Sequence, residues 1–131
     1  MRKNIGVFRG KRKDNGEWVQ GNYLCLHQSD DTDLHIIVDE HGIYNPIDPE
    51  TVGEFTAFSD RHDTAIFEGD IAEYDDRVRM SVIGVVALKN GAWVLTCGKH
   101  NYFLYVTRND TKVFGNIHDN PELLGAGKAN T

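Results

Sequence analysis

Residues 66–71 read Ile-Phe-Glu-Gly-Asp-Ile, and this stretch decides the fold. Its Glu-Gly-Asp segment lies between apolar residues, which predicts a tight turn that starts a strand over residues 71–74. Further along, residues 84–86 are Gly-Val-Val and residues 90–91 are Asn-Gly. A strand starting at Gly-Asp-Ile, a second strand that glycine allows to bend, and an Asn-Gly hairpin are the order expected for a small barrel of the SH3 type.

Short apolar or alternating runs separated by turn residues occupy the rest of the chain, and almost nothing has helical spacing. The Asn-Gly pairs at residues 15–16 and 90–91 suit type I′ turns, because both central residues of such a turn need positive φ. Three hairpins are predicted, joining residues 5–12 to 18–26, 34–38 to 43–44, and 82–88 to 92–96. Further strands, short and rich in β-branched or aromatic residues, are expected at residues 52–58, 71–74, 103–107 and 113–117. The sequence therefore predicts an all-β protein.

Helical signals are confined to two single turns. Residues 120–122, Asn-Pro-Glu, supply a capping residue, a proline suited to the first helical position and an acid that the helix dipole favours. Residues 48–51, Asp-Pro-Glu-Thr, have a similar composition. The sequence therefore predicts one short C-terminal helical turn, and residues 48–51 are compatible with a similar short turn.

A polar run at residues 59–64 interrupts two apolar stretches and marks the division of the chain. We expect two small packed β subdomains, since neither half buries a large core alone. They are an N-terminal β subdomain at residues 1–60 and an SH3-like β-barrel subdomain at residues 61–125, followed by a frayed tail at residues 126–131.

Charge is unevenly distributed along the chain. Asp and Glu number 15 between residues 30 and 76, against the single Arg61, whereas residues 1–29 and 77–131 each carry a net charge of +4. An acidic surface repels phosphate, so the middle segment disfavours nucleic-acid binding. The basic N-terminal strip is interpreted as a solvated edge strand whose charges prevent aggregation. It contains Arg2, Lys3, Arg9, Lys11, Arg12 and Lys13.

The sequence contains no membrane segment and no signal peptide. The longest unbroken apolar stretch after the N-terminus is residues 85–88, far short of the roughly 20 residues that span a bilayer. No apolar block follows the basic residues 1–13. Cys25 and Cys97 allow a single disulfide at most, unlike the dense framework of small secreted proteins. A cytoplasmic protein with reduced cysteines is therefore expected.

Two short Cys/His pairs together offer the four ligands of a tetrahedral zinc site. Cys25 and His27 would share one face of a strand, whereas the gap between Cys97 and His100 is more typical of a turn. Free cysteine is commonly a small buried hydrophobic residue, and this interpretation of Cys25 and Cys97 is favoured over a zinc site. No metal ligand and no cofactor are therefore predicted, and zinc at Cys25, His27, Cys97 and His100 stays an open alternative.

Asp33 and His35 alternate along a strand and share one face, as in some divalent-cation sites. Calcium loops need a glycine-bearing turn and a late bidentate Glu, but residues 36–38 are Ile-Ile-Val, which belong in a core. The favoured interpretation of this segment is a solvated acidic loop that leads into a strand.

No catalytic residue is predicted. Ser29, Ser59 and Ser81 are the serines of the chain, and none lies in a Gly-x-Ser-x-Gly turn. The six histidines are scattered, as is usual for surface or hydrogen-bonded positions. His118 lies in a segment where side-chain hydrogen bonds can fix a turn. The sequence therefore predicts that the protein is not an enzyme.

Five blocks of sequence, in order from Phe8 to Leu124, match a known family. They are Phe-Arg-Gly-Lys-Arg at residues 8–12, Asn-Gly-Glu-Trp-Val-Gln-Gly at 15–21, Asp-Pro-Glu-Thr-Val-Gly at 48–53, Ile-Phe-Glu-Gly-Asp-Ile at 66–71 and Gly-Asn-Ile-His-Asp-Asn-Pro-Glu-Leu-Leu at 115–124. Together they resemble the YopX family of phage and prophage proteins. Where that family usually has Phe-Thr-Gly-Leu and a Lys-rich turn, this chain has Phe-Thr-Ala-Phe at residues 55–58 and a polar run.

The resemblance implies an all-β protein with an SH3-like barrel in its C-terminal half, found in bacteria as part of mobile elements. It implies no activity and no catalytic residues. The leading hypothesis is therefore a non-enzymatic phage or prophage accessory protein that acts through protein contacts, including self-association through exposed β edges or aromatic patches. The aromatic side chains suited to such contacts are Trp18, Tyr23, Tyr44, Tyr102 and Tyr105.

Two alternatives stay open, and neither involves a membrane. The first is a nucleic-acid-binding module that combines the basic N-terminal strip with further cations and with base stacking on Tyr102 or Tyr105. Those cations are Arg77, Arg79, Lys99, Arg108 and Lys112. The second alternative is a metal-dependent enzyme built on the two Cys/His pairs, for which the sequence indicates neither a substrate pocket nor a general base.

Overall fold

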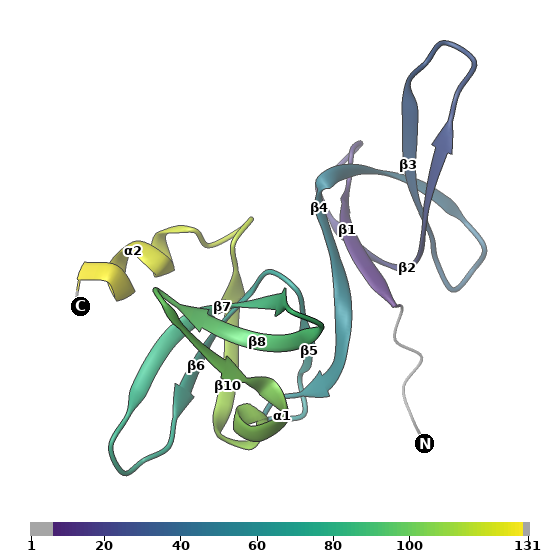
Figure 1. The fold of residues 1–131 in the computed structure, drawn as a ribbon. Helices are drawn as coiled ribbons and strands as arrows, with labels where there is room; N and C mark the ends of the chain where they lie inside the picture. Colours follow the sequence, from purple (N-terminus) through teal and green to yellow (C-terminus); the bar gives the residue numbers. More distant parts are fainter. Residues whose placement is uncertain (1–6, 130–131) are drawn as a thin grey trace. The chain divides into compact units, whose positions relative to one another are not determined.

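The computed structural model describes residues 7–129 of a chain that divides into two compact units, residues 1–55 and 56–131. The described residues are mostly β, as predicted: they form two five-stranded antiparallel sheets, ordered β1-β2-β3-β4-β5 and β10-β6-β7-β8-β9 (Figure 1). Strand β4 (Tyr44–Ser59) continues from the first unit into the second, so the chain changes units inside a strand and not in the polar run at residues 59–64. No helix among the described residues is long and apolar enough to cross a membrane.

The first unit contains β1 (Phe8–Arg12), β2 (Trp18–His27), β3 (Asp33–Val38) and most of β4. Strands β1 and β3 each pair with both β2 and β4, so the four strands form a closed ring of pairings. Ile37 and Ile47 are fully buried in this unit. Burying each of these side chains contributes about 1.5–3 kcal/mol, which makes the pair the centre of a small core.

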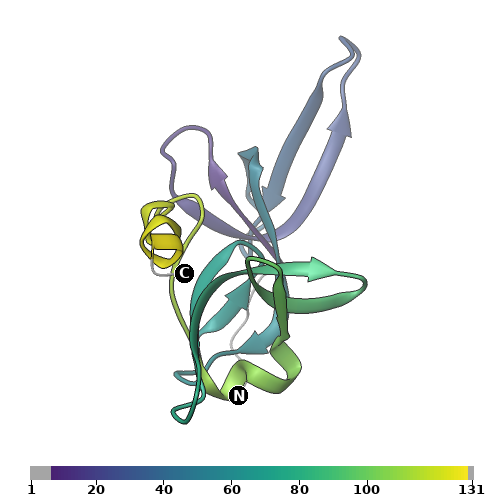
Figure 2. The same cartoon turned by 60° about the vertical axis from the view of Figure 1, so that its left-hand side comes forward.

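Strands β2 and β3 form a long hairpin, visible in both views of the fold (Figures 1 and 2). Its register runs from Asn22 opposite Val38 to His27 opposite Asp33. Only the last three residues of β3, beginning at Ile36, pair with β4. The outer part of the hairpin is therefore two-stranded. The sequence analysis did not predict this pairing, because it matched β2 with β1 and β3 with β4 only.

Residues 48–51, whose composition is compatible with a short helical turn, form no helix. These residues belong to β4, at a place where its register against β1 shifts. The Thr51 hydroxyl donates to the Asp48 carbonyl at 2.6 Å and accepts the backbone N–H of Lys11 at 2.8 Å. The side chain of Thr51 therefore replaces a missing ladder partner, and the segment forms an irregularity within the strand instead of a turn of helix.

The predicted type I′ turn at residues 15–16 is wrong. Gly16 has a φ of 72°, but Asn15 is not among the residues with positive φ. The Asn15 side chain instead accepts the backbone N–H of Glu17 at 2.9 Å, inside a longer loop. The same dipeptide at Asn90-Gly91 does form the predicted two-residue turn, with φ values of 51° and 81°. The length of the connection between the strands decides the difference. Two residues connect the strands on either side of Asn90-Gly91, whereas five residues connect β1 to β2.

The second unit continues from the end of β4 through β5, the last strand of the first sheet, then through the five strands of the second sheet and three helical segments. They are β5 (Ala65–Phe67), β6 (Asp70–Asp75), β7 (Ser81–Lys89), β8 (Ala92–Cys97), β9 (His100–Phe103), α1 (Leu104–Thr107), the 3-10 helix η1 (Arg108–Asp110), β10 (Thr111–Asn116) and α2 (Glu122–Ala129). Strands β6 to β9 form an antiparallel meander, and β10 returns to pair with β6. The buried core of this unit consists of Ile66, Ala72, Val86, Leu95 and Leu104.

The Glu-Gly-Asp turn ties three segments of the second unit together. The buried carboxylate of Asp70 accepts the backbone N–H of Phe67 at 2.7 Å. Gly69 has a φ of 89°, donates its N–H to Val86 and accepts the N–H of Ile117, both at 2.9 Å. A residue with a side chain is strained at this φ. Glycine therefore allows the backbone conformation in which Gly69 bonds to both Val86 and Ile117.

Residues 103–107 were predicted to form a strand, and this prediction is wrong from Leu104 onward. Leu104 is fully buried in the core and starts the one-turn helix α1. The Thr107 hydroxyl donates to the Phe103 carbonyl at 3.0 Å, and the Thr111 hydroxyl donates to the Thr107 carbonyl at 2.8 Å. The chain has to reverse here to bring β10 beside β6, and this tertiary requirement overrides the local strand preference.

The C-terminal helix is longer than the single turn predicted. Helix α2 runs to Ala129 and so includes residues 126–129 of the predicted frayed tail, while residues 130–131 lie outside the described part of the chain.

The turn contacts predict that Asp70→Ala destabilises the protein by about 2 kcal/mol, because a buried N–H loses a charged acceptor. Urea denaturation followed by tryptophan fluorescence measures the change. Asp75→Ala is the matched control, since Asp75 accepts an exposed N–H from Arg77 at 2.8 Å. The control is expected to change stability by no more than about 0.5 kcal/mol. Equal effects of the two substitutions would contradict this role of Asp70.

Candidate functional site

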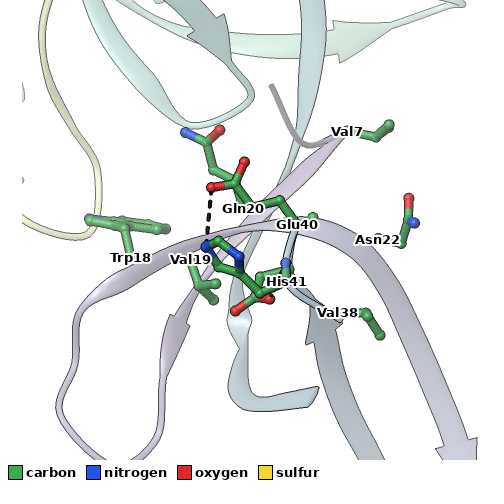
Figure 3. A pocket seen from close by; sticks show the side chains of 10 residues that line it. Val7, Trp18, Val19, Gln20, Asn22, Val38, Glu40 and His41 are labelled. Atoms are coloured by element: carbon green, nitrogen blue, oxygen red, sulfur yellow. Dashed lines mark hydrogen bonds and ion pairs between the residues drawn. The ribbon is translucent and has the colours of Figure 1, made fainter. Parts of the chain in front are cut away.

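The first unit has a pocket of about 550 Å³ beside strands β1, β2 and β3. Figure 3 shows it from close by, with polar side chains at its rim. Its lining residues are Val7, Trp18, Val19, Gln20, Gly21, Asn22, Val38, Asp39, Glu40 and His41. None of these described residues is a serine, cysteine or lysine, so the part of the pocket formed by residues 7–41 offers no such nucleophile.

The charged groups of this pocket lie in the turn between β3 and β4. Asp39 accepts the N–H groups of His41 at 2.9 Å and of Ile43 at 3.0 Å, and the Asn45 side chain at 3.2 Å. These hydrogen bonds, led by the one from Ile43, lower the pKa of Asp39. His41 Nε2 lies 3.5 Å from the carboxylate of Glu40, and both side chains are largely exposed (Figure 3). The arrangement stabilises a turn and leaves a polar, open surface.

Trp18 lines the same pocket and is in contact with two cations. The Arg9 guanidinium lies 4.7 Å from the centre of its ring, and the Lys11 ammonium lies 5.5 Å from it. Both distances are within cation–π range. These three residues of the predicted basic strip and aromatic set therefore contact one another across the β1–β2 pair.

The second unit has a smaller pocket of about 300 Å³ with a more apolar lining. It is formed by Tyr74, Asp76, Met80, Asn101, Tyr102, Phe103, Val106 and Thr107. Phe103 is 56% exposed and Val106 is 69% exposed. Burial, followed by the negative charge of Asp76, raises the pKa of Tyr74, so this phenol stays protonated at neutral pH.

Exposed apolar side chains continue on the segments that form this second pocket. Tyr105, on helix α1, is 80% exposed, and Val78, in the turn between β6 and β7, is 85% exposed. We call Val78, Met80, Phe103, Tyr105 and Val106 the apolar patch. Of the five aromatics predicted for contacts, Tyr44 and Tyr105 are largely exposed, whereas Trp18, Tyr23 and Tyr102 are half-buried.

The four residues of the alternative zinc site lie in two different units. Cys25 and His27 are on β2 of the first unit, and Cys97 and His100 are paired across the turn between β8 and β9 of the second. Neither unit contains all four ligands, and zinc at this set stays an untested alternative. The interpretation of Cys25 as a buried hydrophobe is wrong, because its side chain is exposed.

The structure instead brings Cys25 together with residues that the sequence analysis assigned to a solvated acidic loop. One ligand atom each from Cys25, Asp33 and His35 lies within 4.8 Å of the others. We call these three residues the hairpin cluster. The turn between His27 and Asp33 was the signal that could have revealed it, since pairing the runs on either side of that turn places Cys25 opposite His35.

His118 lies in a turn built by Asn116, as its sequence predicts. The Asn116 side chain accepts the N–H groups of His118 at 3.0 Å and Asp119 at 2.9 Å, and donates to the Asp119 carboxylate at 3.1 Å.

The cations proposed for nucleic-acid binding are spread over several elements of the second unit. Arg77 is in the turn between β6 and β7, while the Arg108 guanidinium lies 5.8 Å from the ring centre of Phe58.

The comparisons with known proteins agree with this fold. The family model described as YopX protein matches residues 7–125. This chain belongs to the YopX family. No curated protein matches this YopX-family chain significantly.

Two solved structures share the fold of this YopX-family chain. Protein EF1440 from Enterococcus faecalis is 22% identical to it, with a TM-score of 0.57 over 93% of this chain and 99% of that one. Protein yopX from Bacillus subtilis is 14% identical, with a TM-score of 0.58 over 92% of this chain and 99% of that one. At these identities the likeness establishes the fold.

The contacts of Asp39 predict a pH dependence of the turn that lines the first pocket. The folded pKa lies below the unfolded value, so the stabilisation is complete above the unfolded pKa and is lost as pH falls through the folded pKa. In Asp39→Asn, the amide of Ile43 should exchange with solvent faster than in the wild type at neutral pH. In Glu40→Gln, the matched control, that exchange should stay unchanged. An NMR titration that places the pKa of Asp39 at or above 3.8 would contradict the assignment.

Proposed function

We propose that this YopX-family chain is a non-enzymatic accessory protein of a phage or prophage, which acts by protein contacts and pairs with a second copy of itself. The observation that carries the proposal is the apolar patch: Met80, Phe103 and Val106 line one pocket, and Val78 and Tyr105 are exposed on the same two segments of the chain. Exposed apolar clusters of this kind mark interaction surfaces more often than isolated exposed residues do.

The composition of the apolar patch supports a second copy as the partner. The pocket supplies a hollow lined by Tyr102, Phe103 and Val106, and Tyr105 and Val78 supply projecting apolar groups on adjoining segments. A two-fold interface needs one surface that contains both parts, because each copy presents the same patch to the other. The patch meets this requirement.

The charged residues next to the apolar patch also favour a second copy of the chain as the partner. The turn between β6 and β7 carries Asp75 and Asp76 followed by Arg77 and Arg79. Two such turns facing each other in antiparallel order would place carboxylates opposite guanidinium groups. A partner of one charge sign would not match both halves of this turn, so the mixed charge favours a second copy.

We also infer that the second unit is an SH3-like barrel. Its sheet order, β10-β6-β7-β8-β9, with the 3-10 helix η1 before the last strand, corresponds to the strand order of SH3 barrels. The glycine at residue 84, where a Cβ would collide with the carbonyl of Thr96, lets β7 and β8 approach closely. Many barrels of this kind bind peptides or other subunits, which is compatible with a role in protein contacts.

Self-association predicts that Val106→Asp weakens the dimer about tenfold or more, because a buried valine contributes about 1.5–3 kcal/mol to an interface. Sedimentation velocity over a range of protein concentrations measures the dissociation constant. Ile43→Asp is the matched control, since Ile43 is 55% exposed and lies in the first unit. Its dissociation constant should match that of the wild type. A wild-type protein that stays monomeric at every concentration would contradict the proposal.

Nucleic-acid binding is the second candidate, favoured by one observation. Arg77 and Arg79 lie in the segment between Asp76 and Met80, which both line the pocket that contains the rings of Tyr74 and Tyr102. Proteins that bind single-stranded nucleic acid combine cations for phosphate contact with aromatic rings for base stacking in this way. This function predicts an affinity for single-stranded DNA that falls steeply with salt, and a slope reduced by about 2 in the double variant Arg77→Ala, Arg79→Ala. Self-association alone predicts weak binding with no such slope. Fluorescence anisotropy over a salt series distinguishes the two functions.

A further inference from the structure

The outer part of the β2–β3 hairpin carries polar side chains along one face, and several of them are of types that commonly bind metals. Tyr23, Cys25 and His27 alternate along β2, and the register places His35 opposite Cys25 and Asp33 opposite His27. Residues directly opposite each other in an antiparallel pair project to the same side of the sheet. The hairpin cluster and His27 therefore share one face, within the first unit alone.

The distances between the donor atoms of the hairpin cluster are close to the distances between the ligand atoms of a bound metal ion. Its sulfur, nitrogen and oxygen donors lie within 4.8 Å of one another. Ligand atoms around a tetrahedral zinc ion are separated by about 3.3–3.8 Å, as follows from metal–ligand distances of about 2.0–2.3 Å. Cys25 and Asp33 are exposed, so rotation of their side chains can close the remaining gap without moving the backbone.

Two further contacts orient the ligands of the cluster. His35 Nδ1 lies 2.6 Å from the Tyr23 hydroxyl, and the two rings are stacked with centres 6.0 Å apart. This leaves Nε2 of His35 for a metal. His27 Nδ1 lies 3.0 Å from the Asp33 carboxylate. Hydrogen bonds from outside the ligand set commonly fix the tautomer and direction of metal ligands in this way.

We propose that Cys25, Asp33 and His35 bind one zinc ion, with the fourth position filled by water. A thiolate, a carboxylate and a neutral imidazole balance the double charge of zinc, and the proton of the Cys25 thiol leaves to solvent on binding. Mixed sulfur and nitrogen donors favour zinc over magnesium or calcium. His27 and Tyr23 are positioning residues, which act through Asp33 and His35.

The hairpin itself gives a physical reason for such a site. Residues 33–35 pair with β2 alone, and a two-stranded segment is only marginally stable in water. Cys25 and His35 lie on opposite strands, so a shared zinc ion would link the two strands across the unsupported part of the hairpin. Metal binding would then stabilise the paired state, because the unpaired strands lack the site.

Titration of the full chain with Zn²⁺, in competition with a chromophoric chelator, tests the proposal. We expect one zinc ion per chain, and a loss of affinity of about tenfold or more in Cys25→Ser and in Asp33→Asn. Cys97→Ser is the matched control, because Cys97 is the other cysteine of the chain and lies in the second unit. Its zinc affinity should equal that of the wild type.

Two additional measurements keep the test sharp. Co²⁺ in place of Zn²⁺ should give a thiolate-to-cobalt absorption band that Cys25→Ser loses and Cys97→Ser keeps. Zinc should also slow amide exchange at Leu26 and Leu34, which pair across the hairpin. A wild-type chain that binds no stoichiometric zinc, a band that survives in Cys25→Ser, or a band that disappears in Cys97→Ser would each overturn the proposal.

Discussion

The buried carboxylate of Asp70 is the interaction on which the second unit depends. It satisfies the N–H of Phe67 inside the Glu-Gly-Asp turn, and Gly69 at the centre of that turn bonds to Val86 and Ile117. Those contacts join the start of β6 to β7 and to the segment after β10. Unpaired backbone groups in the same place would each cost about 1–3 kcal/mol, so the turn and the strands around it form together.

The fold separates two kinds of surface. The core residues Val86, Leu95 and Leu104 occupy the interior of the second unit, and the reversal at α1 leaves Tyr105 and Val106 outside. In the first unit, Ile37 and His35 project to the same face of β3, but Ile37 lies in the core where β4 also pairs with β3, and His35 lies on the outer, two-stranded part of the hairpin. The surface proposed for apolar contact and the proposed metal site thus lie in separate units, so substitutions can test each of them without altering residues of the other.

Sequence patterns predicted the elements whose structure is set locally. The turn at Asn90-Gly91, the strand after Gly69 and the Asn116 turn all follow from residue types that favour one backbone conformation. The failures arise where tertiary contacts decide, as at Leu104, whose burial turns a strand-like segment into a helix. The hairpin cluster was missed for the same reason, since strand pairing, which local sequence does not specify, brings Cys25 to His35.

Native-state amide hydrogen exchange of the wild-type chain tests the central claim most directly. If the Glu-Gly-Asp turn ties the second unit together, the amides of Phe67, Gly69 and Ile117 should exchange only through complete unfolding of that unit, as the core strands do. Exchange of these three amides as fast as that of Gly16, in an exposed turn of the first unit, would contradict the account.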